Sequence, residues 1–155
     1  MEIPLKIRVQ VILKEIKEWS VVWFQDNTLK YPGPHWYIII PTSDPSQFLL
    51  SMITSQGDKL IKYYKNTRKP KAAECLVKIS NDEFEFLSRN SVIDCNGCEQ
   101  LSAEEIIHRM DEATGFNRYP NKIPAYLRKE IVSAIMGSPL IAPFIQKIAK
   151  TTNPL

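Results

Sequence analysis

The pattern of apolar and polar residues changes twice along the chain. β-Branched and aromatic runs, which are typical of strands, fill the stretch from Val21 to Cys95, and helical periodicity appears on both sides of it. Pro, Gly, Asn and Asp residues separate the runs and indicate turns. The pattern predicts strands at Ser20–Gln25, His35–Pro41, Phe48–Thr54, Lys59–Tyr64, Ala73–Ile79 and Ser91–Cys95.

Helices are expected on both sides of this β-rich stretch. Residues 1–19 carry apolar side chains at helical spacing, although the alternation from Ile3 to Val11 leaves a strand open as an alternative; we favour the helix. After the strands, Ser102 and Glu105 have the spacing of a capping box. Two further helices are expected, from Pro124 to Gly137 and from Leu140 to Lys150.

Several short strands with short connections predict a small β-barrel. The chain has 155 residues, which is within the usual range of one domain. We therefore expect an α+β fold in a single domain, residues 1–155. It would comprise an N-terminal helix in residues 1–19, a barrel in residues 20–98 and a C-terminal helical extension in residues 99–155.

Composition narrows the picture only slightly. The net charge is +3, a mild basic bias that permits an anionic partner without requiring one. The odd number of cysteines and the lack of an apolar signal core near the N-terminus predict a reducing, cytoplasmic location. The longest uncharged apolar stretch, Ile131 to Gln146, contains a glycine and two prolines and is shorter than the ~20 residues of a membrane helix, so no membrane partner is expected.

Candidate chemistry begins where two predicted strands end. A hairpin that turns about Asp44 and Pro45 pairs Pro41 with Phe48. Counting back along both strands then pairs the first residue of one strand, His35, with the last residue of the next, Thr54. A register slip of one residue would bring Ser55 there instead of Thr54.

This pair suits the cleavage of RNA by its own 2'-OH. A histidine titrates near neutrality and can move a proton, and hydroxyl groups can hold phosphate oxygens. The plainer alternative is that His35 caps a strand and donates one hydrogen bond. Trp23 and Trp36, which lie close by in sequence, are expected in the core or in an interface.

The stretch from Val21 to Asn96, about half of the chain, resembles the PemK/MazF-like toxins. The resemblance rests on "HWYIIIP" after a Pro-Gly loop, on "FLLSMITSQG", and on "FLSRNSVIDC", where Ser91 and Asp94 fall in the hydroxyl-bearing final motif of the family. It implies an SH3-like barrel that cuts RNA without a metal or another cofactor. It also implies a homodimer that is neutralised by an antitoxin protein.

His35 stands where the best-known branch of the family has an arginine. A histidine can move protons but cannot supply a permanent bidentate phosphate clamp, so some positive charge must come from elsewhere. The segment from Lys59 to Lys71 contains six basic residues, no acidic residue and two tyrosines. We expect phosphates on the cations and unstacked bases on the rings, with a solvated hairpin edge as the alternative. The candidate RNA-binding residues are Lys59, Lys62, Tyr63, Tyr64, Lys65, Arg68 and Arg89.

The motif "CNGC", Cys95 to Cys98, has the spacing of half a zinc site, which Cys75 and His108 would complete. Asn-Gly is also the strongest two-residue signal for a hairpin turn, and such a turn explains the motif without a metal. We therefore expect no metal site and no redox chemistry.

The resulting hypothesis is a metal-independent endoribonuclease that cleaves single-stranded RNA. Its catalytic residues would be His35, Thr54, Ser55 and Ser91. The alternative is a non-catalytic barrel that binds RNA or a protein partner. Convergence of His35 and Thr54 with Ser91 in an open groove would favour the enzyme.

Overall fold

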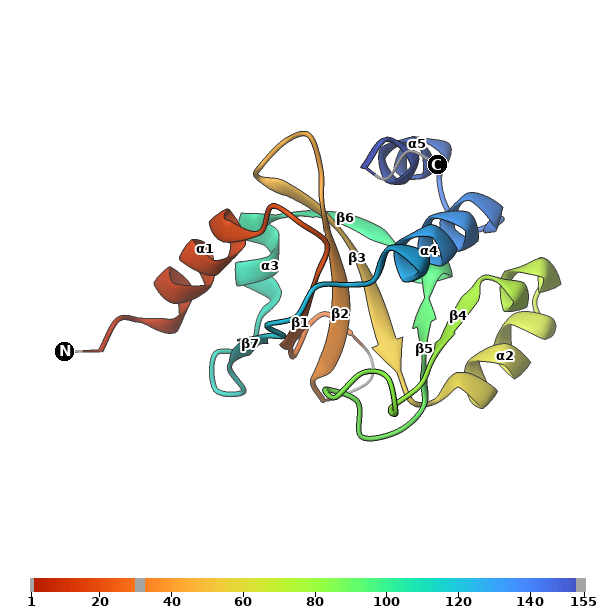
Figure 1. The fold of residues 1–155 in the computed structure, drawn as a ribbon, viewed down its shortest axis with the longest axis horizontal. Coiled ribbons are helices and arrows are strands. Elements are labelled where there is room, and N and C mark those ends of the chain that lie inside the picture. The colour runs from red at the N-terminus through yellow and green to blue at the C-terminus, as the bar shows by residue number, and fades with distance from the viewer. Residues whose placement is uncertain (1, 30–32, 153–155) are drawn as a thin grey trace.

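The computed structural model describes residues 2–29 and 33–152 as five α-helices and one seven-stranded sheet (Figure 1). The helices are α1 (Leu5–Glu15), α2 (Gly57–Lys65), α3 (Ala103–Arg109), α4 (Ala125–Gly137) and α5 (Pro143–Thr152). The strands are β1 (Ser20–Phe24), β2 (His35–Pro41), β3 (Gln47–Thr54), β4 (Leu76–Ile79), β5 (Ser91–Asp94), β6 (Glu99–Ser102) and β7 (Phe116–Arg118). Two short 3-10 helices are η1 (Pro70–Glu74) and η2 (Cys95–Gly97). The expected mixture of strands with N- and C-terminal helices is confirmed.

The strands pair antiparallel in the order β4-β5-β3-β2-β1-β7. On the side of β3 away from β2, β5 pairs with its C-terminal end and β6 pairs with its N-terminal half. β4 and β7 lie at opposite edges of this sheet. Within the described residues the sheet is therefore not closed into a barrel.

Helices cover both faces of the sheet, and this explains why the central strands are apolar without alternation. Ile38 of β2 belongs to a core that includes Ile131 of α4. The next residue, Ile39, belongs to a second core on the opposite face, together with Leu13 of α1 and Ile106 of α3. Figure 1 shows α4 crossing the sheet on the near side and α1 standing beside it.

The hairpin of β2 and β3 has the register that the sequence predicts, with Pro41 opposite Phe48. Side chains of the turn bond locally and close it. The Thr42 hydroxyl donates to the carbonyl of Asp44, whose Oδ1 accepts from the Ser46 backbone N–H at 2.9 Å. This Asx-type turn fixes the register from its closed end.

The strand predicted at Lys59–Tyr64 is wrong, because this segment is helix α2. Leu60, Ile61 and Tyr64 recur at helical spacing and turn inward, while the lysines are exposed. Asp58 in the first turn and basic residues in the last turn suit the helix dipole. The amphipathic period was thus a stronger signal than the two tyrosines, which by themselves favour a strand.

The hairpin turn predicted at Asn96–Gly97 is also wrong. An Asn-Gly hairpin turn of the common type needs positive φ at both central residues. Among the described residues, only Gly33 and Gly115 have positive φ. The Asp94 side chain instead accepts from the Asn96 backbone N–H at 3.1 Å and starts the 3-10 helix η2. β5 and β6 consequently follow one another along β3 and do not pair together.

The other helix predictions are confirmed with small shifts at their ends. Ser102 and Glu105 form the expected capping box, with hydrogen bonds of 2.9 and 3.0 Å. α4 follows Pro124 and ends at Gly137. The elements α1, α5 and β4 begin later in the chain than expected, and the short strands β6 and β7 were not predicted.

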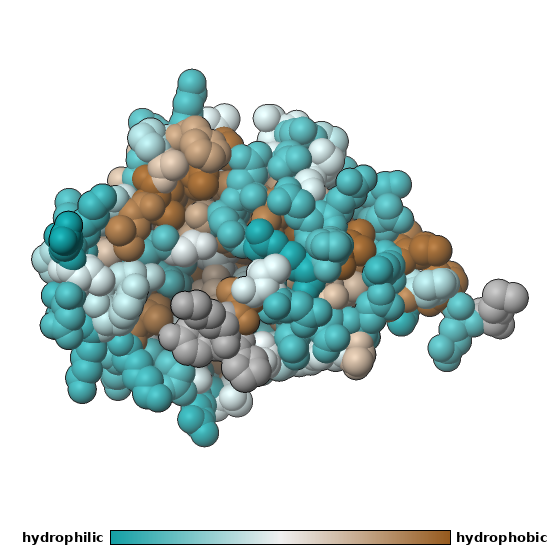
Figure 2. Space-filling view, turned by 180° about the vertical axis from the view of Figure 1, so that it is seen from behind, coloured by the Kyte–Doolittle hydropathy of each residue, from teal (hydrophilic) through white to brown (hydrophobic). Residues whose placement is uncertain are grey.

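Apolar side chains also remain at the surface of α1. Ile3, Ile7 and Val11 are half exposed or more and follow one another at i, i+4 spacing. Figure 2 shows this apolar surface near the N-terminal end, at the right of the view. Across the described ranges, no helix is both long enough and apolar enough to pass through a bilayer.

A buried hydrogen bond joins α2 to the sheet and generates the first prediction. The Tyr64 hydroxyl donates to the two carboxylate oxygens of Asp94 at 3.1 and 2.9 Å. Tyr64→Phe removes the donor and leaves a buried carboxylate short of a partner. We expect urea denaturation to show a loss of about 1–3 kcal/mol in the free energy of unfolding.

The matched control is Tyr63→Phe, because Tyr63 is 65% exposed on the same helix. We expect this change to alter the free energy of unfolding by less than about 0.5 kcal/mol. Equal effects of the two substitutions would show that the Tyr64–Asp94 bond does not anchor α2.

Candidate functional site

The start of β2 and the end of β3 lie side by side at one end of the sheet (Figure 1). The last pair in the ladder is Trp36 with Ile53, so one further step along both strands sets His35 opposite Thr54. This is the predicted pairing, and the slip to Ser55 does not occur. Directly opposed Cβ atoms in such a pair lie about 4.5–5.5 Å apart, which allows both side chains to reach one ligand atom.

A cavity of about 390 Å³ opens at this end of the sheet. It is lined by all four residues that the sequence analysis selected as catalytic, namely His35, Thr54, Ser55 and Ser91. These side chains come from the start of β2, the end of β3 and the start of β5. The fold thereby gathers a base and three hydroxyl groups from separate parts of the chain.

Aromatic side chains form the apolar wall of the same cavity. Trp23 and Trp36 line it, as does Phe86 from the segment that joins β4 to β5. The Trp36 and Phe86 ring centroids are 5.0 Å apart. Flat rings beside polar groups are suited to hold a nucleobase or another planar group. The sequence predicts both tryptophans in the core or in an interface, and it contains no signal that points to Phe86.

His35 has the electrostatic environment of a base. Its ring is half buried, and burial lowers the pKa of His35 below the ordinary value of 6.5, while the Gly33 backbone acts in the opposite direction. The buried Nδ1 atom has no hydrogen-bond partner within the described part of the chain. At neutral pH the imidazole is therefore mostly uncharged and able to accept a proton.

The three hydroxyl groups differ in what they can still donate. Thr54 Oγ1 accepts from the Gln56 backbone N–H at 3.1 Å, so its own proton remains available. Ser91 Oγ donates to the Arg89 carbonyl at 3.0 Å, so it presents lone pairs to the cavity unless the hydroxyl rotates. Ser55 is exposed. Thr54 and Ser55 are thus better placed than Ser91 to donate to a phosphate oxygen.

A second cavity of about 490 Å³ adjoins the first, because Ser55 and Ser91 line both. In the wall of this cavity the first turn of α2 lies directly against β5. Gly57 allows this close approach, since a Cβ at its position would lie 2.9 Å from Val92 Cγ1. The other polar side chains of its lining, which the sequence did not predict, come from α2, β4, the β4–β5 loop and α4, and no sequence motif joins them. They include Asp58, Lys78, Glu83, Asn90, Tyr126 and Glu130.

The predicted RNA-binding residues are mostly exposed along α2 and the loop after it. Lys59, Lys62, Lys65 and Arg68 are exposed, and so are Tyr63 and Arg89. Of the residues of α2, Gly57, Asp58 and Ile61 line the second cavity, and the lysines of this helix do not.

The prediction for Tyr64 requires a correction. Tyr64 is only 8% exposed, and its hydroxyl bonds to Asp94, so its ring cannot stack on a base. The helical period of α2 turns neighbouring side chains in different directions, which leaves Tyr63 as the stacking candidate of this pair.

The three cysteines, Cys75, Cys95 and Cys98, are buried and free. Burial raises the pKa of each thiol, for Cys98 to about 11, so the reactive thiolate form is suppressed. Over the described ranges, no three or more His, Cys, Asp or Glu side chains are gathered to hold a metal ion. Cys95 and Cys98 pack in the core between the sheet and the C-terminal helices.

Comparison with known proteins does not assign the chain to a family. No protein-family model matches the sequence, and no curated protein matches it.

The environment of His35 generates the second prediction. NMR titration of the ring protons should give a midpoint below pH 6.5, because burial disfavours the charged imidazolium. The spectrum of His35→Gln assigns the resonance. A midpoint at or above 6.5 would mean that an anionic group, and not burial, controls the ring.

Proposed function

We propose that this protein is a metal-independent endoribonuclease that cleaves single-stranded RNA through attack of a ribose 2'-OH on the adjacent phosphate. The observation that carries the proposal is the convergence of His35, Thr54, Ser55 and Ser91 on one cavity. The register that brings His35 to Thr54 supports it as well.

In this mechanism His35 accepts the proton of the 2'-OH. The 2'-oxygen forms a bond to phosphorus while the bond from phosphorus to the 5'-oxygen breaks, and the leaving 5'-oxygen takes a proton from water. The products are a 2',3'-cyclic phosphate and a 5'-hydroxyl end. The lowered pKa of His35 favours the base role, because the neutral ring is the form that accepts a proton. The nucleophile belongs to the substrate, so the reaction needs no metal-activated water.

The hydroxyl groups and the nearby cations would supply what the missing arginine does not. Thr54 and Ser55 donate to the non-bridging phosphate oxygens, which stabilises the charge that develops during attack. Lys59, Lys62 and Lys65 on the exposed side of α2 attract the flanking phosphates. This division assigns proton transfer to His35 and charge neutralisation to the hydroxyl groups and the lysines.

The proposal includes a PemK/MazF-like fold and biology. β3 pairs with β2 on one side and with β5 and then β6 on the other, a branching that would form the corner of a partly open SH3-like barrel. The same proposal includes a cytoplasmic homodimer that is neutralised by an antitoxin protein. The motifs "HWYIIIP" and "FLLSMITSQG" support it.

A non-catalytic module that binds RNA or a protein is the second candidate. It is favoured by the local hydrogen bonds of Thr54 and Ser91, which also suit a purely structural role. The basic side of α2 would bind RNA both in the endoribonuclease and in an RNA-binding module. Cleavage assays therefore separate the two candidates, and binding assays do not.

The third prediction tests the base. His35→Ala should lower the rate of RNA cleavage by ~10²–10⁴-fold, the usual contribution of a general base, and the wild-type rate should rise with pH through the midpoint measured by NMR. His108→Ala is the matched control, because His108 is exposed on α3 and should leave the rate unchanged.

Product analysis completes this test. We expect 2',3'-cyclic phosphate ends, and a substrate with 2'-deoxyribose at the cleavage point should resist. Full cleavage by the His35→Ala protein, or no cleavage of any RNA by wild-type protein freed of partners, would leave only the binding module.

The fourth prediction concerns the lysines of α2. Replacing Lys59, Lys62 and Lys65 together with Gln should weaken binding to single-stranded RNA and lower the slope of log affinity against log salt by about 2, at ~0.7 per released counterion. The control replaces three exposed lysines of the C-terminal helices, Lys129, Lys147 and Lys150. An unchanged slope in the α2 variant would remove this helix from the RNA-binding surface.

A further inference from the structure

The second cavity has no task in the cleavage chemistry, although it is the larger of the two. Its volume of about 490 Å³ lies within the range of sites for small ligands, which is roughly 300–1,000 Å³. Since Ser55 and Ser91 line both cavities, a nucleotide whose phosphate is held at Ser55 can place its base in the second cavity.

The charges in this cavity are unsuited to the RNA backbone. Asp58, Glu83 and Glu130 contribute carboxylates, and among the described residues of its lining Lys78 is the one basic residue. Carboxylates repel phosphate but accept hydrogen bonds from N–H groups. The lining therefore suits a group that is rich in N–H donors, such as the edge of a nucleobase.

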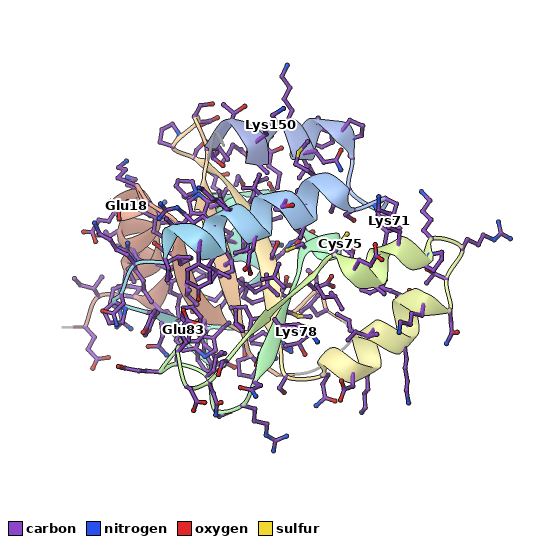
Figure 3. All side chains as sticks on the ribbon, turned by 45° about the vertical axis from the view of Figure 1, so that its right-hand side comes forward. Glu18, Lys71, Cys75, Lys78, Glu83 and Lys150 are labelled. Atoms are coloured by element: carbon purple, nitrogen blue, oxygen red, sulfur yellow. The ribbon has the colours of Figure 1, made fainter. Side chains whose placement is uncertain are left out.

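Glu83 is held in place by a side chain from a distant helix. The Tyr126 hydroxyl, in the first turn of α4, donates to Glu83 Oε1. This leaves Oε2 and a second lone pair of Oε1 for a ligand. Figure 3 shows Glu83 in the loop after β4, below the N-terminal half of α4. The segment that carries it is anchored by Phe84 and Phe86, whose rings pack in the core near Trp36.

Asn90 offers the complementary group at the other end of the same loop. Its Oδ1 accepts from the Asn81 backbone N–H at 3.0 Å, which fixes the orientation of the amide. The Nδ2 group then remains to donate to a ligand carbonyl. The cavity thus combines a positioned carboxylate acceptor with an amide donor.

Guanine matches this combination better than the other bases do. Its N1–H and N2 amino group are adjacent donors that a carboxylate accepts side by side, and its O6 accepts from an amide. Adenine and cytosine place a ring acceptor beside their amino group, and this acceptor would face the negative carboxylate. Uracil has a single N–H between two carbonyl groups.

We propose that the second cavity is a guanine-binding subsite for a nucleotide next to the cleaved phosphate, with Glu83 accepting from N1–H and N2 and Asn90 donating to O6. The place of the subsite in RNA cleavage rests on the proposed function. The binding of guanine itself does not, which allows the two to be tested apart.

The first experiment measures binding by isothermal titration calorimetry with guanosine and uridine monophosphates, each as the 3'- and the 5'-isomer. The wild-type protein should bind a guanosine nucleotide about 10-fold or more tightly than its uridine counterpart, as expected for a bidentate pair. Glu83→Gln should abolish this preference, because its amide has one acceptor oxygen and still accepts from Tyr126. Asp82→Asn, the matched control outside the cavity, should keep it. Equal affinities, no binding, or a preference that survives Glu83→Gln would overturn the guanine subsite.

The second experiment maps the cuts that wild-type protein makes in a long single-stranded RNA. Guanine should be enriched at one nucleotide that flanks the cut, and inosine, which lacks the 2-amino group, should lower cleavage there by about 10-fold. Cleavage without regard to guanine would overturn the subsite and leave the proposed ribonuclease standing. Guanine binding that depends on Glu83, without cleavage of any RNA, would overturn the ribonuclease and leave the subsite as part of a binding module.

Discussion

The antiparallel ladder between β2 and β3 runs through the middle of the sheet, and both cores and the candidate site depend on its register. Successive side chains of a strand point to opposite faces of the sheet. If β2 slipped by one residue relative to β3, each of its side chains would move to the opposite face. Ile38 would then leave the core that it shares with α4. The same slip would separate His35 from Thr54. The apolar packing that selects the register therefore also positions the polar end of the hairpin.

The surroundings of this end divide charge between two regions. The exposed side of α2 is basic, whereas the second cavity carries three carboxylates and one lysine. Gly57 makes this arrangement possible, because the absence of a side chain lets α2 start directly against Val92 of β5. A polyanion and a neutral base that is rich in N–H donors would be held by different parts of one continuous surface.

The loop between β4 and β5 joins the apolar core to the polar lining of the second cavity. Phe84 is buried in the apolar core and Phe86 packs against it, and Glu83, the residue directly before Phe84, is consequently held at the cavity wall. Glu83 is further restrained by Tyr126 of α4. The C-terminal helices therefore do more than cover the sheet, since one of them supplies a wall and a positioning hydroxyl.

The sequence alone determined the elements whose signals are local. The apolar runs of β2 and β3 and the turn at Asp44 predicted the hairpin and even the pairing of His35 with Thr54. The capping box at Ser102 predicted the start of α3. The four residues that the sequence predicted as catalytic are all among those that line the first cavity. Local signals failed where two of them competed. In α2 the aromatic residues favour a strand, but the segment follows the helical period. At Asn96 the carboxylate of Asp94 stabilises a 3-10 helix in place of the hairpin turn that Asn-Gly favours.

The path of the sheet and the composition of the second cavity depend on contacts between segments that are far apart in the chain. β6 and β7 are short and are stabilised by their neighbours, so their own residues carry little strand signal. Asp58, Glu83 and Tyr126 are far apart in the chain and meet because α2, the β4–β5 loop and α4 pack at one end of the sheet. A single sequence records which side chains are available and the local periods that place them on a face. Which faces then meet is set by long-range packing of the two cores, and no spacing within the sequence encodes it.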